Sequence, residues 1–226
     1  MCGRVIVDYD EIISGAKSTE IAAWLSELPQ GAQSNWNLAP TQPIPIVFTS
    51  DKDQQKHFDL AHWGIIPPWS KDGSARFTFN ARVETLIEKP TFAPSVKSQR
   101  CAFPVSGFYE WTGKKGSRTP HAIFGPKPIL ALAGLYRWWK SPDSEWVLTA
   151  TILTRSSAGV MERLHDRMPV FLSDELTSDW LNPEIVGNLD LVNLAADLAA
   201  PISRELTEYE VRPLRGNGRE LIQPAS

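Results

Sequence analysis

The sequence predicts an α+β fold, built on a mainly antiparallel β-sheet with short helices at its margins. The middle of the chain consists largely of stretches rich in β-branched and aromatic residues and separated by glycine or proline, which is typical of strands and hairpins. Segments with apolar residues at helical spacing are short and lie mainly near the two ends. With 226 residues, 42% of them hydrophobic, the chain is long enough to bury a full core, and we expect one domain over residues 1–226.

The expected elements follow the chain in order. In residues 18–28, Ser18 is placed to cap a short amphipathic helix that Pro29 ends. Prolines predict an extended loop at 40–45, and residues 71–80 predict another loop. Strands are predicted at IPIVF (44–48), FDLAHW (58–63), RCAFPVSGFYEW (100–111), HAIFGPKPILALAGLYRWW (121–139), EWVLTATILTR (145–155) and, as an edge strand, YEVRPL (209–214). Further helices are predicted at SAGVMERLH (157–165), SDELTSDWLN (173–182) and LVNLAADLAA (191–200).

Composition excludes several classes of protein. The net charge of −3 argues against a protein that coats nucleic acid indiscriminately, although a local basic groove is compatible with it. No apolar stretch approaches a membrane span, and the first residues lack the features of a signal peptide, so a cytoplasmic protein is expected. Cys2 and Cys101 are the only cysteines, and in a reducing compartment neither a disulfide nor a structural zinc site is expected. Cys101 is interpreted as an ordinary buried thiol.

Few residues are candidates for catalysis. None of the four histidines has the spacing of a metal-ligand pair, so no metal site is predicted. His165 lies in LHDRMPV beside a carboxylate and a guanidinium, which suits either catalysis or a local loop contact. Glu110 stands between two aromatic residues, where desolvation would raise its pKa toward that of a general acid, unless the side chain faces water. Asn80 and Arg82 can supply an amide and a phosphate-binding fork, or Asn80 can cap a helix.

The chain begins MCGR, which places a cysteine directly after the initiator methionine. Removal of Met1 would give Cys2 a free α-amine next to its thiol, unless the dipeptide occurs there by chance. The ordinary pKa values of these groups, roughly 7.7–8.0 for the amine and about 8.5 for the thiol, would leave both nucleophiles usable at cellular pH.

Six short motifs together resemble one family. MCGR, NLAPTQ, WGIIPPW, NARVET, RCAFPVSGFYEW and HDRMPV occur here in the order and spacing of the SRAP (SOS response-associated peptidase) family of abasic-site-processing proteins. The resemblance extends from Cys2 to about Trp180, and the tail beyond Trp180 carries no motif. Val83, Val105 and Ser106 depart from the residues common in the motifs, but none of them has a chemical role.

The resemblance implies a barrel-like β core and a sensor of abasic sites in single-stranded DNA. Met1 would be removed autocatalytically, and Cys2 would then form a Schiff base and a thiazolidine crosslink that shields the lesion. Asn80 would hold the N-terminus and the sugar, Glu110 would move protons during crosslinking and reversal, and His165 would assist opening of the sugar ring. The residues expected to contact DNA are Arg4, Pro40, Trp69, Arg82 and Arg167.

The resemblance further implies a monomer without cofactor, metal or membrane partner, cytoplasmic and associated with the nucleoid when bound to DNA. Three other functions stay open at this stage. An N-terminal-nucleophile amidohydrolase also begins Met-Cys-Gly, although Arg4 follows here. A cysteine peptidase could use Cys2 and Glu110. A non-enzymatic binder of single strands could stack bases on the nine tryptophans.

Overall fold

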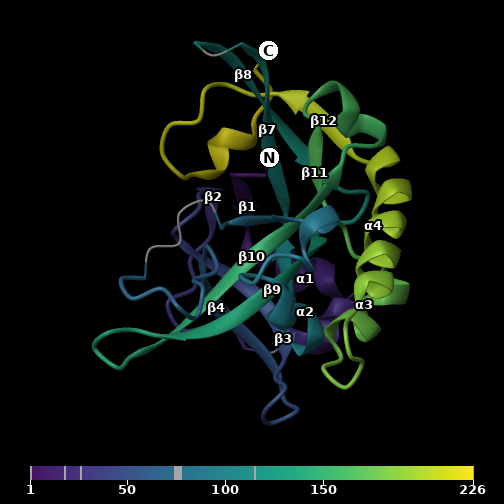
Figure 1. Ribbon diagram of the computed structural model, residues 1–226. Coiled ribbons are helices and arrows are strands. Elements are labelled where there is room, and N and C mark those ends of the chain that lie inside the picture. Colours follow the sequence, from purple (N-terminus) through teal and green to yellow (C-terminus); the bar gives the residue numbers. More distant parts are fainter. Residues whose placement is uncertain (1, 18, 26, 74–77, 115, 226) are drawn as a thin grey trace.

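The computed structural model describes residues 2–17, 19–25, 27–73, 78–114 and 116–225 (Figure 1). It confirms the α+β fold class and its mainly antiparallel strands. The strands in the described residues are β1 (Val5–Val7), β2 (Asn35–Leu38), β3 (Pro43–Thr49), β4 (Lys56–Trp63), β5 (Asn80–Arg82), β6 (Arg100–Val105), β7 (Gly107–Lys114), β8 (Ser117–Phe124), β9 (Leu130–Lys140), β10 (Trp146–Ser156), β11 (Arg167–Pro169) and β12 (Thr207–Glu210). The helices are α1 (Tyr9–Ala16), α2 (Ala93–Ser98), α3 (Asp174–Leu181) and α4 (Leu189–Arg204), with 3-10 helices η1 (Glu20–Trp24), η2 (Val83–Thr85), η3 (Gly159–Arg163) and η4 (Arg219–Ile222).

Five strands close into a barrel. The pairings run from β10 through β4, β3, β6 and β9 back to β10, so the ladder has no open edge along this circuit. The β4–β10 pair is parallel and the other four are antiparallel, which makes the barrel mixed but mainly antiparallel. Strands β5 and β11 both pair with the C-terminal part of β10, so this barrel strand fixes their positions.

A second, five-stranded sheet has the order β12-β8-β7-β1-β2 and is antiparallel throughout. Its β7 follows β6 of the barrel after a single residue, Ser106. The main hydrophobic core includes the barrel interior, and a smaller cluster around Ile6, Tyr109, Ala122 and Val211 includes residues of the second sheet and of the C-terminal segment, residues 211–225. Two separate cores therefore border β1 and β7.

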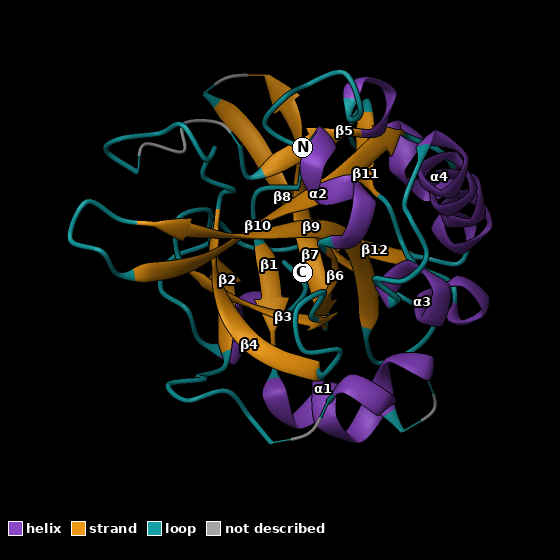
Figure 2. Ribbon diagram, turned by 60° about the horizontal axis from the view of Figure 1, so that its bottom comes forward, coloured by secondary structure: helices purple, strands orange, loops and turns teal. Residues whose placement is uncertain are grey.

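The helices lie around the margin of the strands, as expected (Figure 2). Helix α1 was not anticipated; the Asp8 carboxylate caps it by accepting hydrogen bonds from the backbone N–H groups of Asp10 and Glu11. The predicted helix at 18–28 is wrong, because the chain forms only the five-residue η1, in which Ile21 and Trp24 are buried three residues apart. Ser18 lies outside the described residues. The segment 157–165 likewise forms the 3-10 helix η3 rather than an α-helix.

Strands form in every region where they were predicted, although β3 begins at Pro43, within the loop predicted at 40–45. The edge strand predicted at 209–214 is wrong in its bounds, because β12 ends at Glu210, but β12 lies at a sheet edge as expected. Asn80 belongs to strand β5, which pairs with β10 in parallel, so its reading as a helix cap is wrong. Cys2 and Cys101 are both free and fully buried. Among the described helices, none has the length and hydropathy needed to cross a bilayer.

Candidate functional site

Strand pairing brings the start of the chain beside Glu110. In the β1–β7 ladder Val5 lies opposite Phe108, and the N–H of Tyr109 donates to the Arg4 carbonyl at 3.0 Å. Because the strands are antiparallel, the same register continued by one more residue places Gly3 opposite Glu110. The pairing of β1 with β7 thus brings together the MCGR and RCAFPVSGFYEW motifs, which lie about a hundred residues apart in the sequence.

Glu110 is a buried carboxyl group. Its side chain is 3% exposed, and burial raises the pKa of this carboxyl above the ordinary value of 4.5, with the nearby charge of His165 among the effects that oppose the rise. The prediction that desolvation would raise this pKa is therefore confirmed in direction, and the alternative in which Glu110 faces water is wrong.

Cys2 is held in place by Asn80. The Nδ2 group of Asn80 donates to the Cys2 carbonyl at 2.8 Å, while its Oδ1 is buried without a hydrogen-bond partner among the described residues. Burial, reinforced by the charge of Glu110, raises the pKa of the Cys2 thiol well above its ordinary value. The expectation that this thiol titrates near its ordinary pKa is wrong, so the thiol is neutral at cellular pH in this state.

His165 follows η3 and precedes β11. Its Nδ1 accepts a hydrogen bond from the backbone N–H of Arg167 at 2.9 Å and lies 2.6 Å from Oδ1 of Asp166. The backbone N–H can donate to Nδ1 only when the ring is neutral with its proton on Nε2, whereas the short contact with the Asp166 carboxylate requires a proton on Nδ1, so the two contacts belong to two protonation states of the ring. The imidazole can then donate from Nε2 and, when protonated on both nitrogens, can pair with Asp166.

A cleft of about 490 Å³ unites several of the predicted residues. Gly3 and Arg4 come from the start of the chain, Glu110 comes from β7, and Pro40 and His165 come from two loops. Within the described residues, no group of three or more histidine, cysteine, aspartate or glutamate side chains could hold a metal ion. The complete lining of the cleft is Gly3, Arg4, Pro40, Phe79, Glu110, Trp111, Gly113, Arg118 and His165.

Arg167 lies beside this cleft but is already engaged. Its Nη1 and Nη2 groups bind the two carboxylate oxygens of Glu84 at 2.6 and 2.8 Å, and Nη2 also donates to the Thr154 carbonyl at 2.7 Å. This pairing lowers the pKa of Glu84. A phosphate could take the Arg167 fork only if the ion pair with Glu84 opened. By contrast, Arg82, the arginine of the NARVET motif, is exposed.

Pro40 and Trp69 occupy turns at the surface. The turn at Pro40 is closed by a hydrogen bond from the Gln42 N–H to the Ala39 carbonyl at 3.2 Å, and Thr41 within it has a positive φ of 76°. Such a backbone angle is uncommon for threonine and stores strain beside the cleft. Trp69 is 58% exposed, in keeping with a stacking surface, but it does not line the cleft.

Sequence reasoning missed four residues of the cleft, namely Phe79, Trp111, Gly113 and Arg118. Arg118 lies on β8 directly opposite Gly113 of β7. Its guanidinium is exposed and makes no hydrogen bond or ion pair with the described part of the chain. The only sequence signal was that arginines are frequent in the middle of the chain, between residues 76 and 167. The position of Arg118 at the cleft depends on the register of the hairpin.

Comparison with known proteins identifies relatives over nearly the whole chain. Residues 1–217 match the family model described as SOS response associated peptidase (SRAP), which confirms the resemblance and extends it beyond Trp180. The abasic site processing protein YoqW of Bacillus subtilis (strain 168) is 34% identical over 233 residues, covering 99% of each chain. The abasic site processing protein HMCES of Mus musculus is 27% identical over 274 residues, covering 100% of this chain and 76% of its own.

Two solved structures share the fold. A crystal structure of a protein from Bacteroides thetaiotaomicron superimposes with a TM-score of 0.78 at 22% identity and covers 94% of this chain and 96% of its own. One from Bordetella bronchiseptica superimposes with a TM-score of 0.74 at 22% identity and covers 94% and 100%. At this level of identity the two structures establish the fold, including the barrel-like core.

Proposed function

The chain belongs to the SOS response associated peptidase (SRAP) family, and on this basis we propose that it captures abasic sites in single-stranded DNA as a covalent crosslink. The names of YoqW and HMCES, both abasic site processing proteins, support this proposal. The observation that carries it is the cleft in which Gly3, Arg4, Glu110 and His165 meet, next to the Cys2 carbonyl held by Asn80.

The reaction requires the free α-amine of Cys2, so Met1 must first be removed. The amine nitrogen attacks the aldehyde carbon of the ring-opened sugar and forms a carbinolamine. Loss of the hydroxyl group as water gives an iminium ion. The sulfur then adds to the same carbon, the thiol proton passes to a base, and a five-membered thiazolidine closes with the net loss of one water.

The order of these steps explains how a buried thiol can take part. In the resting state burial and Glu110 keep the Cys2 thiol neutral. The iminium ion places a positive charge next to the sulfur, which favours the thiolate at the moment when it is needed. The amine therefore reacts first, and the thiol reacts only after the lesion has been captured.

Glu110 is suited to move both protons. Because its pKa is raised, the protonated carboxyl group persists to higher pH than an ordinary glutamic acid and can donate to the departing hydroxyl. The resulting carboxylate can accept the thiol proton, and the same group in reverse assists release of the DNA. His165, with a proton on Nε2, can donate to a sugar oxygen during ring opening.

Basic residues would hold the DNA around the lesion. We assign Arg4 and Arg82 to flanking phosphates, and Arg167 to a phosphate only when its pair with Glu84 opens. Pro40 would shape the wall of the cleft, and exposed Trp69 would stack against a neighbouring base. The whole of residues 1–226 would act as one domain and as a monomer, in the cytoplasm and on the nucleoid.

Removal of Met1 would use the same groups, with Cys2 as nucleophile and Glu110 as proton carrier. The two arginines of the cleft favour binding of a polyanion such as DNA. An amidohydrolase would instead bind an uncharged side chain, so the arginines argue against that function.

The proposal is tested by incubating the protein with a single-stranded oligonucleotide that carries one abasic site and running a denaturing gel. We expect a slow band that survives denaturation, loss of that band in Cys2→Ala, and an unchanged band in Cys101→Ala, the matched change at the other buried cysteine. Mass spectrometry should show that Met1 is absent and that the adduct has lost one water. A band of normal intensity from Cys2→Ala would rule out the thiazolidine.

A further inference from the structure

A second cavity adjoins the cleft on the side of the C-terminal segment, and its volume is about 170 Å³. It shares three of its lining residues with the cleft, namely Arg4, Trp111 and Arg118. Asn37 of β2 and, from the C-terminal segment, Pro213 and Leu214 form much of the rest of its wall. The two cavities are therefore continuous along one wall of basic and aromatic side chains.

The charged side chains that line this second cavity are all positive in the described part of the chain. Two guanidinium groups line it, and no carboxylate does so within the described ranges. Neither Arg4 nor Arg118 forms an ion pair with a described residue, so both keep their charge for a ligand. Two arginines that face one small cavity without a carboxylate partner among the described residues match a phosphate group, which accepts hydrogen bonds on several oxygens at once.

Apart from the arginines and Asn37, the residues that line the cavity are apolar or aromatic. The Trp111 ring packs against Tyr109 at a centroid distance of 6.5 Å and also lines the cavity. Leu214 and Trp111 both pack against the small core around Ile6 and Val211. An indole, two prolines and a leucine beside two arginines suit a nucleoside attached to the phosphate, since bases stack on aromatic and apolar side chains.

The C-terminal segment is fixed against the sheet, so its wall of the cavity is preformed. The N–H of Trp36 donates to the Asn217 carbonyl at 3.0 Å, and Nδ2 of Asn37 donates to the Gly216 carbonyl at 2.9 Å. The Oδ1 of the same Asn37 accepts from Nε of Arg4 at 3.1 Å. Figure 1 shows this segment, in yellow, beside β2 and β7. Through Asn37, the segment orients a guanidinium of the reaction cleft.

From these contacts we infer that the cavity is a subsite for one nucleotide that flanks the lesion, with its phosphate between Arg4 and Arg118 and its base against Trp111 and Leu214. This inference rests on the proposed function, because the cleft is taken as the site of the abasic sugar. It assigns a role to Arg118, Trp111, Asn37 and the C-terminal segment. The subsite lies on one side of the cleft, so it holds a nucleotide on one side of the lesion only.

The test measures binding separately from crosslinking. The probe is a fluorescent single-stranded oligonucleotide with a central tetrahydrofuran residue, which mimics an abasic site but has no aldehyde. We expect Arg118→Ala to weaken binding about five- to tenfold and to flatten the slope of log K against log salt by about 0.7, the value for one lost phosphate contact on a single strand. Arg118→Lys should lose less. Arg204→Ala, the matched change at an exposed arginine of α4, should bind like the wild type.

Shortening the oligonucleotide locates the nucleotide. Nucleotides are removed from one side of the tetrahydrofuran and then, in a second series, from the other side. The difference in affinity between Arg118→Ala and wild type should vanish when the nucleotides on one side of the tetrahydrofuran are removed. It should persist when those on the other side are removed. Equal affinity of Arg118→Ala and wild type for every probe would overturn the subsite, as would an Arg118 effect that ignores both truncations.

The two proposals fail in different ways. If the wild type crosslinks abasic DNA but the affinity does not depend on Arg118, the subsite is wrong and the proposed function stands. If the wild type forms no crosslink but the Arg118 effect depends on one flanking nucleotide, the proposed function is wrong and the subsite stands. Thermal unfolding of each variant confirms that exposed Arg118 is not needed for folding.

Discussion

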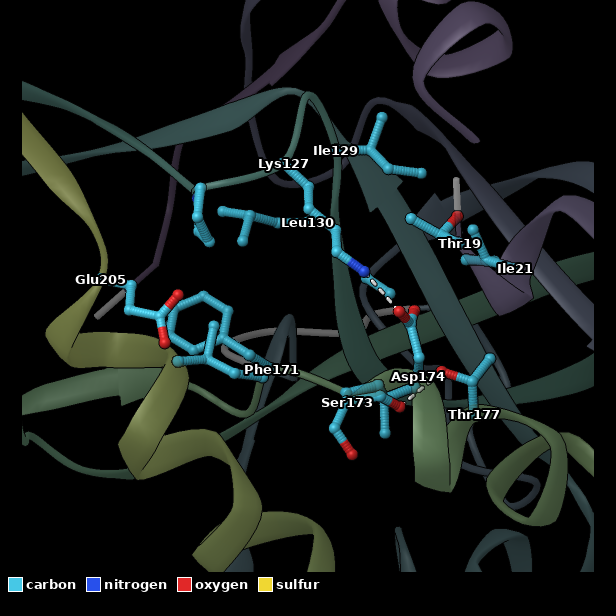
Figure 3. Close-up of a pocket in the computed structure, with 14 residues that line it drawn as sticks. Thr19, Ile21, Lys127, Ile129, Leu130, Phe171, Ser173, Asp174, Thr177 and Glu205 are labelled. Atoms are coloured by element: carbon cyan, nitrogen blue, oxygen red, sulfur yellow. Dashed lines mark hydrogen bonds and ion pairs between the residues drawn. The ribbon is translucent and has the colours of Figure 1, made fainter. Parts of the chain in front are cut away.

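Two cavities of this protein differ in almost every property that matters for chemistry. The cleft at the N-terminus is lined by two arginines, a glutamate and a histidine drawn from separate parts of the chain. The other cavity, about 190 Å³ in volume, lies between the β8–β9 connection, the start of α3 and the end of α4, and its walls include Ile21, Ile129, Leu130 and Phe171 (Figure 3). Its charged groups are Glu205 and the ion pair of Lys127 with Asp174.

The difference shows that an apolar cavity does not by itself indicate the reactive site. The apolar cavity is bordered by core residues whose burial stabilises the fold. In the cleft, Glu110 is buried at a cost to stability, and the Cys2 thiol and the Oδ1 atom of Asn80 are buried nearby. Polar groups that are costly to bury and that converge are the better guide to function. Changes in the cleft should therefore impair crosslinking, and changes in the apolar cavity should reduce only stability.

The largest effect after loss of Cys2 is expected at Glu110. In Glu110→Gln the amide can neither donate a proton to the departing hydroxyl nor accept the thiol proton, so crosslinking should slow about 100-fold, at the lower end of what general acid–base groups contribute. Single-turnover rates on abasic single-stranded DNA measure this. Glu88→Gln, the same change at an exposed glutamate, is the control. A Glu110→Gln rate within twofold of wild type would remove Glu110 from the reaction.

The same variant should be more stable than wild type at neutral pH. The pKa of Glu110 is raised above 4.5 in the folded state, so folding is favoured where the carboxyl is protonated and loses this advantage as the pH rises through the raised value. Glutamine does not titrate. The difference in melting temperature, variant minus wild type, should therefore be near zero at about pH 4 and positive at pH 8. A difference that does not change with pH would contradict the burial of a titrating carboxyl.

A smaller effect is expected at Asn80. Asn80→Ala removes the hydrogen bond to the Cys2 carbonyl, which is worth about 1–1.5 kcal/mol and corresponds to roughly tenfold in rate if the bond positions the nucleophile. Asn80→Asp should be worse than Asn80→Ala, because a carboxylate cannot donate to that carbonyl and adds negative charge beside the thiol. Asn193→Ala on the exposed face of α4 is the control. Equal rates for all three variants would show that the contact is structural only.

Much of this site could be predicted from the sequence, because its motifs are local. Cys2 and Glu110 stand out by position and by apolar surroundings. Their meeting could not be predicted from patterns alone, since it depends on the β1–β7 register between strands of distant sequence. The same applies to Arg118, whose place at the cleft follows from the pairing of Arg118 with Gly113.

Tertiary contacts also changed what individual residues do. From the sequence, the Arg167 guanidinium near His165 was predicted to bind a phosphate. In the structure it binds Glu84, which lies 83 residues earlier in the chain. The strands were predictable because β-branched and aromatic runs between glycines and prolines signal them directly. The prediction of a helix at 18–28 was wrong because, among the described residues of this segment, only Ile21 and Trp24 are buried, and a single 3-10 turn satisfies their spacing.

In the apolar cavity, Ile129→Ala should lower stability without affecting the reaction. Ile129 is 4% exposed, and its truncation should cost about 2–3 kcal/mol, toward the lower end for buried isoleucine because the change enlarges an existing cavity. Urea unfolding measures the loss, and exposed Leu194→Ala on α4 should cost far less. Crosslinking at a temperature where both variants are folded should match the wild type. Slower crosslinking by folded Ile129→Ala would show that the two cavities are coupled.

The smallest effect is expected at the mouth of the same cavity. Lys127 and Asp174 form an ion pair there, and their side chains are 46% and 41% exposed, so water screens the attraction and Lys127→Ala should cost less than about 1 kcal/mol. Asp174→Asn should cost more than Lys127→Ala, because Asp174 is also in the first turn of α3, where a negative charge favours the helix. The cost of Lys127→Ala should shrink further in 0.5 M salt, where the Debye length is only a few ångströms. Urea unfolding at two salt concentrations measures both. If Lys127→Ala instead slowed crosslinking, the division between a reactive cavity and a structural one would be wrong.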